Sequence, residues 1–154
     1  MKKSPQAAIR ISVRKQRLTL RSGRKKLAEY PVSTSRFGLG VKEGSFKTPT
    51  GKFRIAQKIG DGMPLGTVFK SRRPVKPTQK ALQQEDLVMT RILWLDGLEK
   101  RNANTHDRYI YIHGTNHEEK IGLPNSHGCV RMKNLDLVDL FERVTEGTVV
   151  EIRP

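Results

Sequence analysis

Short stretches in which apolar and polar residues alternate, separated by Gly, Pro, Ser and Thr, run through most of this 154-residue chain. A repeat of two residues is typical of strands that bury one face, and the small and Pro-containing separators are typical of turns. The chain is therefore predicted to be mainly β. Strand segments are predicted at residues 9–13, 18–20, 27–32, 53–56, 92–95, 109–113 and 149–152.

A single segment follows the helical repeat, because its apolar residues recur at the spacing of one buried helix face. Asn134 is predicted as its N-cap and Gly147 as its end, which gives a packed helix over about 134–146. The apolar positions that define this face are Leu137, Leu140, Phe141 and Val144.

Residues 57–88 are rich in Gly and Pro and are predicted to form a long flap-like loop. A connection of this length inside a compact domain is usually functional or mobile. The length of the chain suits one domain over residues 1–154.

Positive charge is concentrated near the start of the chain, within a formal net charge of +15. Residues 1–30 hold ten Lys and Arg against one acid, whereas residues 117–154 hold five against seven. A basic end of this kind attracts polyanions such as nucleic acid, anionic wall or lipid material, or nucleotide-linked wall precursors. A solvated surface is the alternative explanation. Nucleic-acid binding as the principal function is disfavoured, because stacking aromatics are sparse and no recognition motif is present.

The only cysteine, Cys129, lies in a segment that also holds three of the four histidines, His113, His117 and His127. A lone cysteine excludes an intrachain disulfide and a four-cysteine zinc site. A thiol becomes a strong nucleophile when a base removes its proton, and histidine is the natural base near neutral pH. His113 ends a predicted strand and precedes Gly114, so its side chain is expected to be well held.

The residues around Cys129 also suit acyl transfer. Gly128 leaves room for a substrate carbonyl, and the amide N–H groups of Gly128 and Cys129 could stabilise an oxyanion. Arg131 shares a strand face with Cys129 and could hold a substrate carboxylate or favour the thiolate. Each residue also has a non-catalytic explanation when it is considered alone. Cys129 could be a buried apolar residue, His127 could be structural, and Arg131 could be a surface ion-pair partner. Their combination around one cysteine favours a catalytic site.

A zinc site built from His113, His117, His127 and Cys129 is a competing interpretation. The spacing of His113 and His117 would suit a helix, but Gly114 and Asn116 indicate a loop. We therefore disfavour the zinc site.

The segments His113-Gly114-Thr115 and Ser126-His127-Gly128-Cys129-Val130-Arg131-Met132 resemble the signature of the L,D-transpeptidase (YkuD-like) catalytic domain family. The resemblance extends to residues 30–34, 48–53 and 134–152. It implies a β-sandwich with a cysteine site under a flap. It also implies an acyl-enzyme made from a peptidoglycan stem tetrapeptide, with release of D-Ala and transfer to an amine or water. The resemblance implies no metal and no cofactor.

The resemblance assigns a role to each residue of the motif. Cys129 matches the nucleophile, His113 the base and the Gly114 carbonyl the group that orients the base. His127 and Gly128 match positions that shape the oxyanion region. Arg131 matches a site arginine of the family. Tyr111 is expected to line the same cleft because it shares a strand face with His113. Arg131, Tyr111 and Ser126 are the residues expected to contact the substrate.

The expected partners are peptidoglycan stem peptides or muropeptides. No stretch reaches the roughly 18 apolar residues of a membrane span. No apolar signal-peptide core follows the basic start, so the chain is expected to be cytoplasmic as written, or periplasmic or wall-located if a leader was removed. In the cytoplasm, the resemblance implies an L,D-carboxypeptidase of muropeptide recycling that uses water as the acceptor.

Overall fold

The computed structural model describes residues 7–154, and most of its ordered elements are strands. Lys2 and Lys3 of the basic start lie outside the described residues. The strands are β1 (Ala7–Ser12), β2 (Arg17–Ser22), β3 (Lys25–Ser33), β4 (Gly51–Ile59), β5 (Val68–Lys70), β6 (Arg73–Val75), β7 (Val88–Gly97), β8 (Tyr111–Gly114), β9 (Val130–Met132) and β10 (Val149–Arg153). The helices are α1 (Gln79–Gln84) and α2 (Asn134–Arg143), and short 3-10 turns form at Lys100–Asn102 and Glu118–Lys120.

The mainly β prediction is confirmed, and all seven predicted strand segments correspond to strands of the structure. Three further strands, β5, β6 and β9, have only three residues each, which is too short to show a repeat of two. Tyr109 lies outside β8, in contrast to the prediction, because its backbone is in the left-handed region with φ of 57°.

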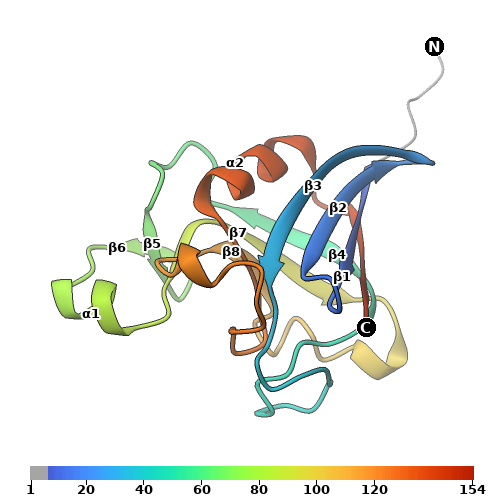
Figure 1. Cartoon of the computed structure of the whole chain (residues 1–154), viewed down its shortest axis with the longest axis horizontal. Coiled ribbons are helices and arrows are strands. Elements are labelled where there is room, and N and C mark those ends of the chain that lie inside the picture. Colours follow the sequence, from blue (N-terminus) through green and yellow to red (C-terminus); the bar gives the residue numbers. More distant parts are fainter. Residues whose placement is uncertain (1–6) are drawn as a thin grey trace.

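The strands form one sheet in the order β4-β10-β1-β2-β3-β9-β8-β7-β5-β6, and β4 also pairs with β7. This additional pairing closes the sheet, so its two halves face each other as the layers of the predicted sandwich. The strands β1–β3 lie in one layer, opposite β7 and β8 (Figure 1). The pairs β1–β10 and β8–β9 are parallel, and the other pairs are antiparallel.

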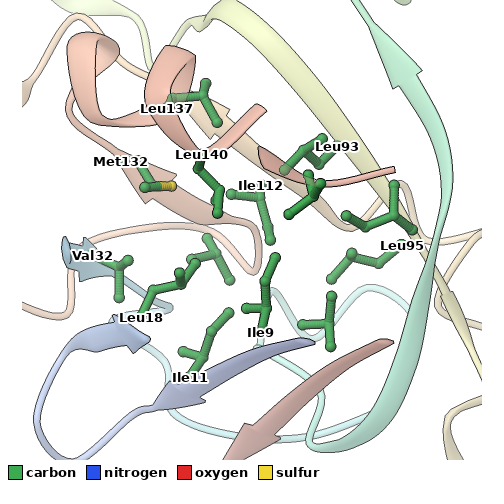
Figure 2. Close-up of a cluster of buried hydrophobic side chains, with 14 of the residues drawn as sticks. Ile9, Ile11, Leu18, Val32, Leu93, Leu95, Ile112, Met132, Leu137 and Leu140 are labelled. Carbon is green, nitrogen blue, oxygen red and sulfur yellow. The ribbon is translucent and has the colours of Figure 1, made fainter. Parts of the chain in front are cut away.

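The main core fills the space between the layers and the inner face of α2 (Figure 2). Alternate residues of each strand point inward, so that Ile9 and Ile11 of β1 face Leu93 and Ile112 of the opposite layer across this core. Burying a side chain of this size stabilises the fold by about 1.5–3 kcal/mol. The helix contributes Leu137, Leu140 and Phe141, as its spacing predicted.

The expected N-cap at Asn134 is wrong, because Lys133 takes the cap position and Asn134 is the first helical residue. The Asn134 side chain instead donates to the Thr115 carbonyl over 2.9 Å and accepts from the Thr90 hydroxyl over 2.6 Å. Its backbone N–H donates to the Glu118 carboxylate over 2.8 Å. A carboxylate beside the first turn suits the positive end of the helix dipole.

The segment predicted as a flap-like loop contains regular structure. Its first residues continue β4, and β5, β6 and α1 follow before β7 begins. We call residues 60–87 the flap, which lies on the side of the molecule away from β1 (Figure 1). Phe69 of the flap is buried and pairs with Val88 of β7, which explains why this connection is ordered.

Residues 8–21 are built into the sheet through β1 and β2, as their alternation predicted. Their basic residues point outward, where Arg10, Arg21 and Lys52 line a hollow of about 170 Å³. None of the helices formed by residues 7–154 has the length and apolar composition needed to cross a membrane.

Candidate active site

The parallel pairing of β8 with β9 brings the two parts of the sequence motif together. Ile112 pairs with Val130 and His113 with Arg131. Side chains alternate between the faces of a strand, so Tyr111, His113, Cys129 and Arg131 share the face opposite the main core. On this face Tyr111 and Cys129 pack in a second apolar cluster with Trp94, Ile92 and Phe69. Because Phe69 belongs to the flap, the flap covers this face.

The Cys129 sulfur lies between two backbone groups of the segment that leads into β8. Its Sγ atom accepts from the Tyr111 N–H over 3.3 Å, and the thiol donates to the Tyr109 carbonyl over 3.3 Å. The pKa of the Cys129 thiol is raised to about 11, mainly by burial. Asp86 also raises this pKa, whereas the Tyr111 N–H, Arg131 and Arg108 lower it. The free protein therefore holds a protonated thiol near neutral pH.

His113 is buried and 3% exposed. Its Nδ1 atom lies 2.5 Å from the Gly114 carbonyl oxygen. A carbonyl can only accept, so Nδ1 carries the proton and Nε2 keeps its lone pair. Burial lowers the pKa of His113, although the bond to Gly114 acts in the opposite direction. Within residues 7–154, the hydrogen bonds of the Cys129 sulfur go to backbone groups and not to this imidazole.

Two glycines of the motif are required by the local geometry. A side chain at Gly114 would meet Asn134 and would lie 2.7 Å from the Met89 carbonyl oxygen. Gly128 has a φ of 120°, which L residues rarely adopt. The Gly128 carbonyl accepts from the Thr48 hydroxyl over 2.9 Å. That contact links the motif to the Thr-Pro-Thr-Gly turn before β4.

Ser126 is 1% exposed, and its hydroxyl is used within the turn that carries Cys129. The hydroxyl donates to the Cys129 carbonyl over 2.6 Å and accepts from the Gly128 N–H over 3.3 Å. Ser126 therefore fixes the shape of the turn in this structure. The Gly128 N–H is already engaged, which leaves the Cys129 N–H as the candidate oxyanion donor from this pair.

His127 stands at the mouth of the site with 42% of its side chain exposed. Its Nε2 atom lies 2.7 Å from Arg36 Nη2, and a guanidinium can only donate, so the imidazole proton is on Nδ1. That nitrogen faces Asp86 Oδ2 at 3.5 Å. The imidazole also packs near the exposed rings of Phe37 and Phe46, each with its centroid 5.8 Å away.

Arg131 is 2% exposed, and its guanidinium is enclosed by protein groups. Its Nη2 atom lies 2.6 Å from Asp86 Oδ2 and 3.1 Å from the Asn125 carbonyl oxygen. Its Nη1 atom donates to Asn125 Oδ1 over 3.1 Å. The position expected for a substrate carboxylate is thus taken by the carboxylate of Asp86.

Tyr111 is buried beside Cys129, and its hydroxyl accepts from Arg72 Nη1 over 3.2 Å. The Arg72 guanidinium, at the tip of the β5–β6 hairpin, also lies over the rings of Trp94 and Tyr109. Two hollows flank Tyr109. One of about 260 Å³ reaches His127 and Phe46, and the other of about 370 Å³ reaches Arg72 and Trp94.

The two remaining histidines contact other groups. His117 lies 3.0 Å from the Glu85 carbonyl oxygen of the flap, and His106 stacks on Trp94 with ring centroids 3.8 Å apart. Within residues 7–154, no three His, Cys, Asp or Glu side chains come together in a way that could hold a metal ion.

Sequence reasoning missed Asp86, Asn125, Arg36 and Arg72, which contact the predicted site residues Arg131, His127 and Tyr111. Asp86 is 45 positions from Arg131, and Arg36 is 91 positions from His127, so no local spacing connects them. A weak signal existed for Asp86, which stands beside Glu85 directly before an apolar strand.

The comparisons with known proteins agree with the fold. A family profile of the L,D-transpeptidase catalytic domain (YkuD) matches residues 6–152. The chain therefore belongs to the L,D-transpeptidase catalytic domain family.

Sequence relatives carry the same family name. YkuD of Bacillus subtilis is 28% identical over 145 residues, which cover 94% of this chain and 64% of that protein. YbiS of Escherichia coli K12 is 54% identical over 44 residues, which cover 29% of this chain and 14% of that protein. The matched region thus spans less than two thirds of either relative.

Solved structures show the same fold at low sequence identity. The L,D-transpeptidase of Xylanimonas cellulosilytica aligns with a TM-score of 0.64 at 18% identity, covering 99% of this chain and 63% of that chain. The L,D-transpeptidase of Mycobacterium smegmatis aligns with a TM-score of 0.62 at 16% identity, covering 97% of this chain and 59% of that chain. LdtMt1, solved in complex with imipenem, aligns with a TM-score of 0.59 at 19% identity, covering 96% of this chain and 58% of that chain.

Proposed function

We propose that this protein catalyses cysteine-dependent acyl transfer on peptidoglycan stem tetrapeptides. The observation that carries the proposal is the placement of Cys129 and His113 on one face of the adjacent, parallel β8 and β9, within a family named for this activity. The donor is the carbonyl of the L-centre of the diamino acid, and the leaving group is D-Ala.

In the proposed reaction, Cys129 Sγ forms a bond to the donor carbonyl carbon while Nε2 of His113 takes the thiol proton. The carbon–nitrogen bond to D-Ala then breaks, and the imidazolium returns the proton to the departing amine. An amine or water attacks the thioester, His113 takes its proton, and the thiol is restored. The Cys129 N–H is the proposed donor to the transient oxyanion.

The protonation states of the free site support a concerted role for His113. Burial raises the pKa of the thiol and lowers that of the imidazole, so the resting pair is neutral. A lone pair on Nε2 is what a general base needs. Catalytic hydrogen bonds often tighten only in the substrate complex, and in this proposal the bound peptide brings Sγ and Nε2 together.

The acceptor decides between transpeptidation and L,D-carboxypeptidase activity, and one experiment tests both. The purified protein is incubated with a disaccharide tetrapeptide, with and without a D-amino acid, and the products are analysed by mass spectrometry. Release of D-Ala with gain of water indicates a carboxypeptidase. An exchanged or dimeric product indicates a transpeptidase. No product with any tetrapeptide donor, from protein that is folded and carries a free thiol, would contradict the proposal.

A covalent probe gives a second test of the same site. Because the structurally similar LdtMt1 was solved in complex with imipenem, we expect imipenem to acylate Cys129. Intact-protein mass spectrometry should show one adduct on the wild type. The absence of any adduct on a folded, reduced protein would count against Cys129 as the nucleophile.

A further inference from the structure

The carboxylate of Asp86 connects two residues of the site. Its Oδ2 atom lies 2.6 Å from Arg131 Nη2 and 3.5 Å from His127 Nδ1. Arg131 and His127 stand on either side of Cys129 in the chain, so one carboxylate oxygen spans the segment that carries the thiol. Asp86 itself belongs to the flap, between α1 and β7.

Arg131 depends on Asp86 for its charge balance. Its side chain is 2% exposed, whereas 28% of the Asp86 side chain is exposed. The other partners of the guanidinium are the neutral side chain and carbonyl of Asn125, and Nε has none among the described residues. Removing one member of a buried ion pair leaves an uncompensated buried charge, which is strongly unfavourable.

The backbone around Asp86 is held in place from the β8 side. Asn116 accepts from the Leu87 N–H over 3.0 Å and donates to the Glu85 carbonyl over 2.8 Å. The His117 imidazole lies 3.0 Å from the same Glu85 oxygen. Asp86 is therefore on the fixed root of the flap and not at its tip. This anchoring argues against a carboxylate that leaves Arg131 whenever a substrate carboxylate arrives.

We propose that Asp86 is a positioning residue of the Cys129 site, which fixes Arg131 and His127 and sets the charge around the thiol. The proposal rests on the acyl-transfer function above. In this proposal Arg131 does not bind the substrate. It forms a network with Asp86 and Asn125, and this network holds the segment that carries Cys129 in the geometry needed for the reaction.

The electrostatics of the site agree with this role. The charged groups that act on the thiol are Asp86 of the flap, Arg131 of β9 and Arg108 before β8. Asp86 raises the pKa of both Cys129 and His113, and Arg131 lowers both. Without the Asp86 charge, Arg131 acts unopposed, so both pKa values move down.

The test compares Asp86→Asn with the matched control Glu85→Gln. Glu85 is the adjacent carboxylate, is exposed, and enters the network only through its backbone. Four quantities are measured for each protein: kcat and KM with a disaccharide tetrapeptide, the pH dependence of Cys129 alkylation by iodoacetamide, and the melting temperature. Asp86→Glu is added as the variant that keeps the charge.

We expect Asp86→Asn to lower kcat about tenfold to a hundredfold, with a smaller change in KM, because misplacement by about 1 Å costs this much. Its alkylation profile should move to lower pH, so the thiol reacts faster near neutrality while turnover falls. Glu85→Gln should keep the wild-type kcat and the wild-type alkylation profile. Asp86→Glu should keep the alkylation profile of the wild type.

Either of two results with Asp86→Asn would overturn the proposal. A lower KM with unchanged or higher kcat in Asp86→Asn would show that the Asp86 carboxylate occupies the position of a substrate carboxylate beside Arg131 and is displaced when the substrate binds. An unchanged alkylation profile would show that Asp86 does not set the charge at the thiol. If Asp86→Asn does not fold, the double variant Asp86→Asn/Arg131→Gln is compared with Arg131→Gln alone, and equal alkylation profiles of these two proteins would overturn the proposal as well. Alkylation needs no peptide substrate, so this arm holds even if the acyl-transfer function fails.

Discussion

His113 donates a hydrogen bond from Nδ1 to the carbonyl oxygen of Gly114, the next residue along β8, over 2.5 Å. The bond fixes the tautomer of the imidazole and leaves Nε2 as its basic nitrogen. It also makes the orientation of the base depend on the backbone of a glycine that is packed against Asn134 and the Met89 carbonyl.

His113→Ala should therefore lower the rate of acyl-enzyme formation about a hundredfold to ten-thousandfold, the usual contribution of a general base. His127→Ala should have a smaller effect, because His127 is half-exposed at the mouth of the site and acts through its contacts with Asp86 and Arg36. Stopped-flow mixing with imipenem, followed by mass spectrometry, measures both rates. A larger loss in His127→Ala than in His113→Ala would reverse the assignment of the base.

Gly114→Ala should disturb the same bond without removing any functional group. The added methyl carbon would lie 2.7 Å from the Met89 carbonyl oxygen, so β8 must shift and move the carbonyl that holds His113. Overpacking of this kind typically costs about 1–3 kcal/mol of stability. We expect a lower melting temperature and a lower kcat together. A useful control is Gly122→Ala, since a methyl group there would meet nothing within 4 Å, although its φ of 102° also adds strain. Wild-type turnover in Gly114→Ala would show that this carbonyl does not orient the base.

Cys129→Ala should fold normally and form no acyl-enzyme. The substitution exchanges one small side chain for another, and within residues 7–154 the sulfur forms hydrogen bonds only with the Tyr109 and Tyr111 backbone, so we expect a change in stability of about 1 kcal/mol or less. Intact mass spectrometry with imipenem and with a tetrapeptide measures the loss, and a thermal melt checks the fold. Any turnover retained by Cys129→Ala beyond the level of a mock purification would exclude a thiol mechanism.

The sequence predicted the strands for physical reasons that act locally, whereas the Cys129–His113 pair was proposed from its residue types and from the resemblance to the L,D-transpeptidase family. Alternate residues such as Ile9 and Ile11 must face the core, and this requirement is visible in a short window. The motif around Cys129 is similarly contained in seven residues. The Asp86 and Arg36 contacts could not be predicted, because they depend on how the flap and the segment after β3 fold back onto β9. The prediction of Asn134 as the N-cap was wrong for the same reason, because its side chain forms hydrogen bonds with Thr90 and Thr115, which are distant in the sequence.

The shifted pKa values of His113 and Cys129 should make the folded protein less stable at low pH and at high pH, respectively. His113 has a pKa lowered from 6.5, so the unfolded chain binds more protons than the folded one below that value, and stability falls as the pH drops through 6.5. Cys129 has a pKa raised from 9.0 to about 11, so the unfolded thiol ionises first, and stability falls as the pH rises from 9.0. Urea unfolding of the wild type and of Cys129→Ala and His113→Asn tests this. Each variant should lose the pH dependence on its own side. Equal slopes in wild type and variants would show that these groups are not perturbed by folding.

Arg131→Lys should lower activity although the positive charge is kept. Lysine is a point charge and cannot replace the planar fork that reaches both Asp86 and Asn125. Each buried hydrogen bond left unmade costs about 1–3 kcal/mol, so the melting temperature should fall as well. The matched control is Arg143→Lys on α2, where an exposed arginine lies 3.3 Å from Asp139 and contributes little. Steady-state kinetics on the tetrapeptide and thermal melts of both variants give the comparison. If Arg131→Lys kept wild-type kcat and KM, the buried fork would be dispensable for catalysis, and Arg131 would serve the fold alone.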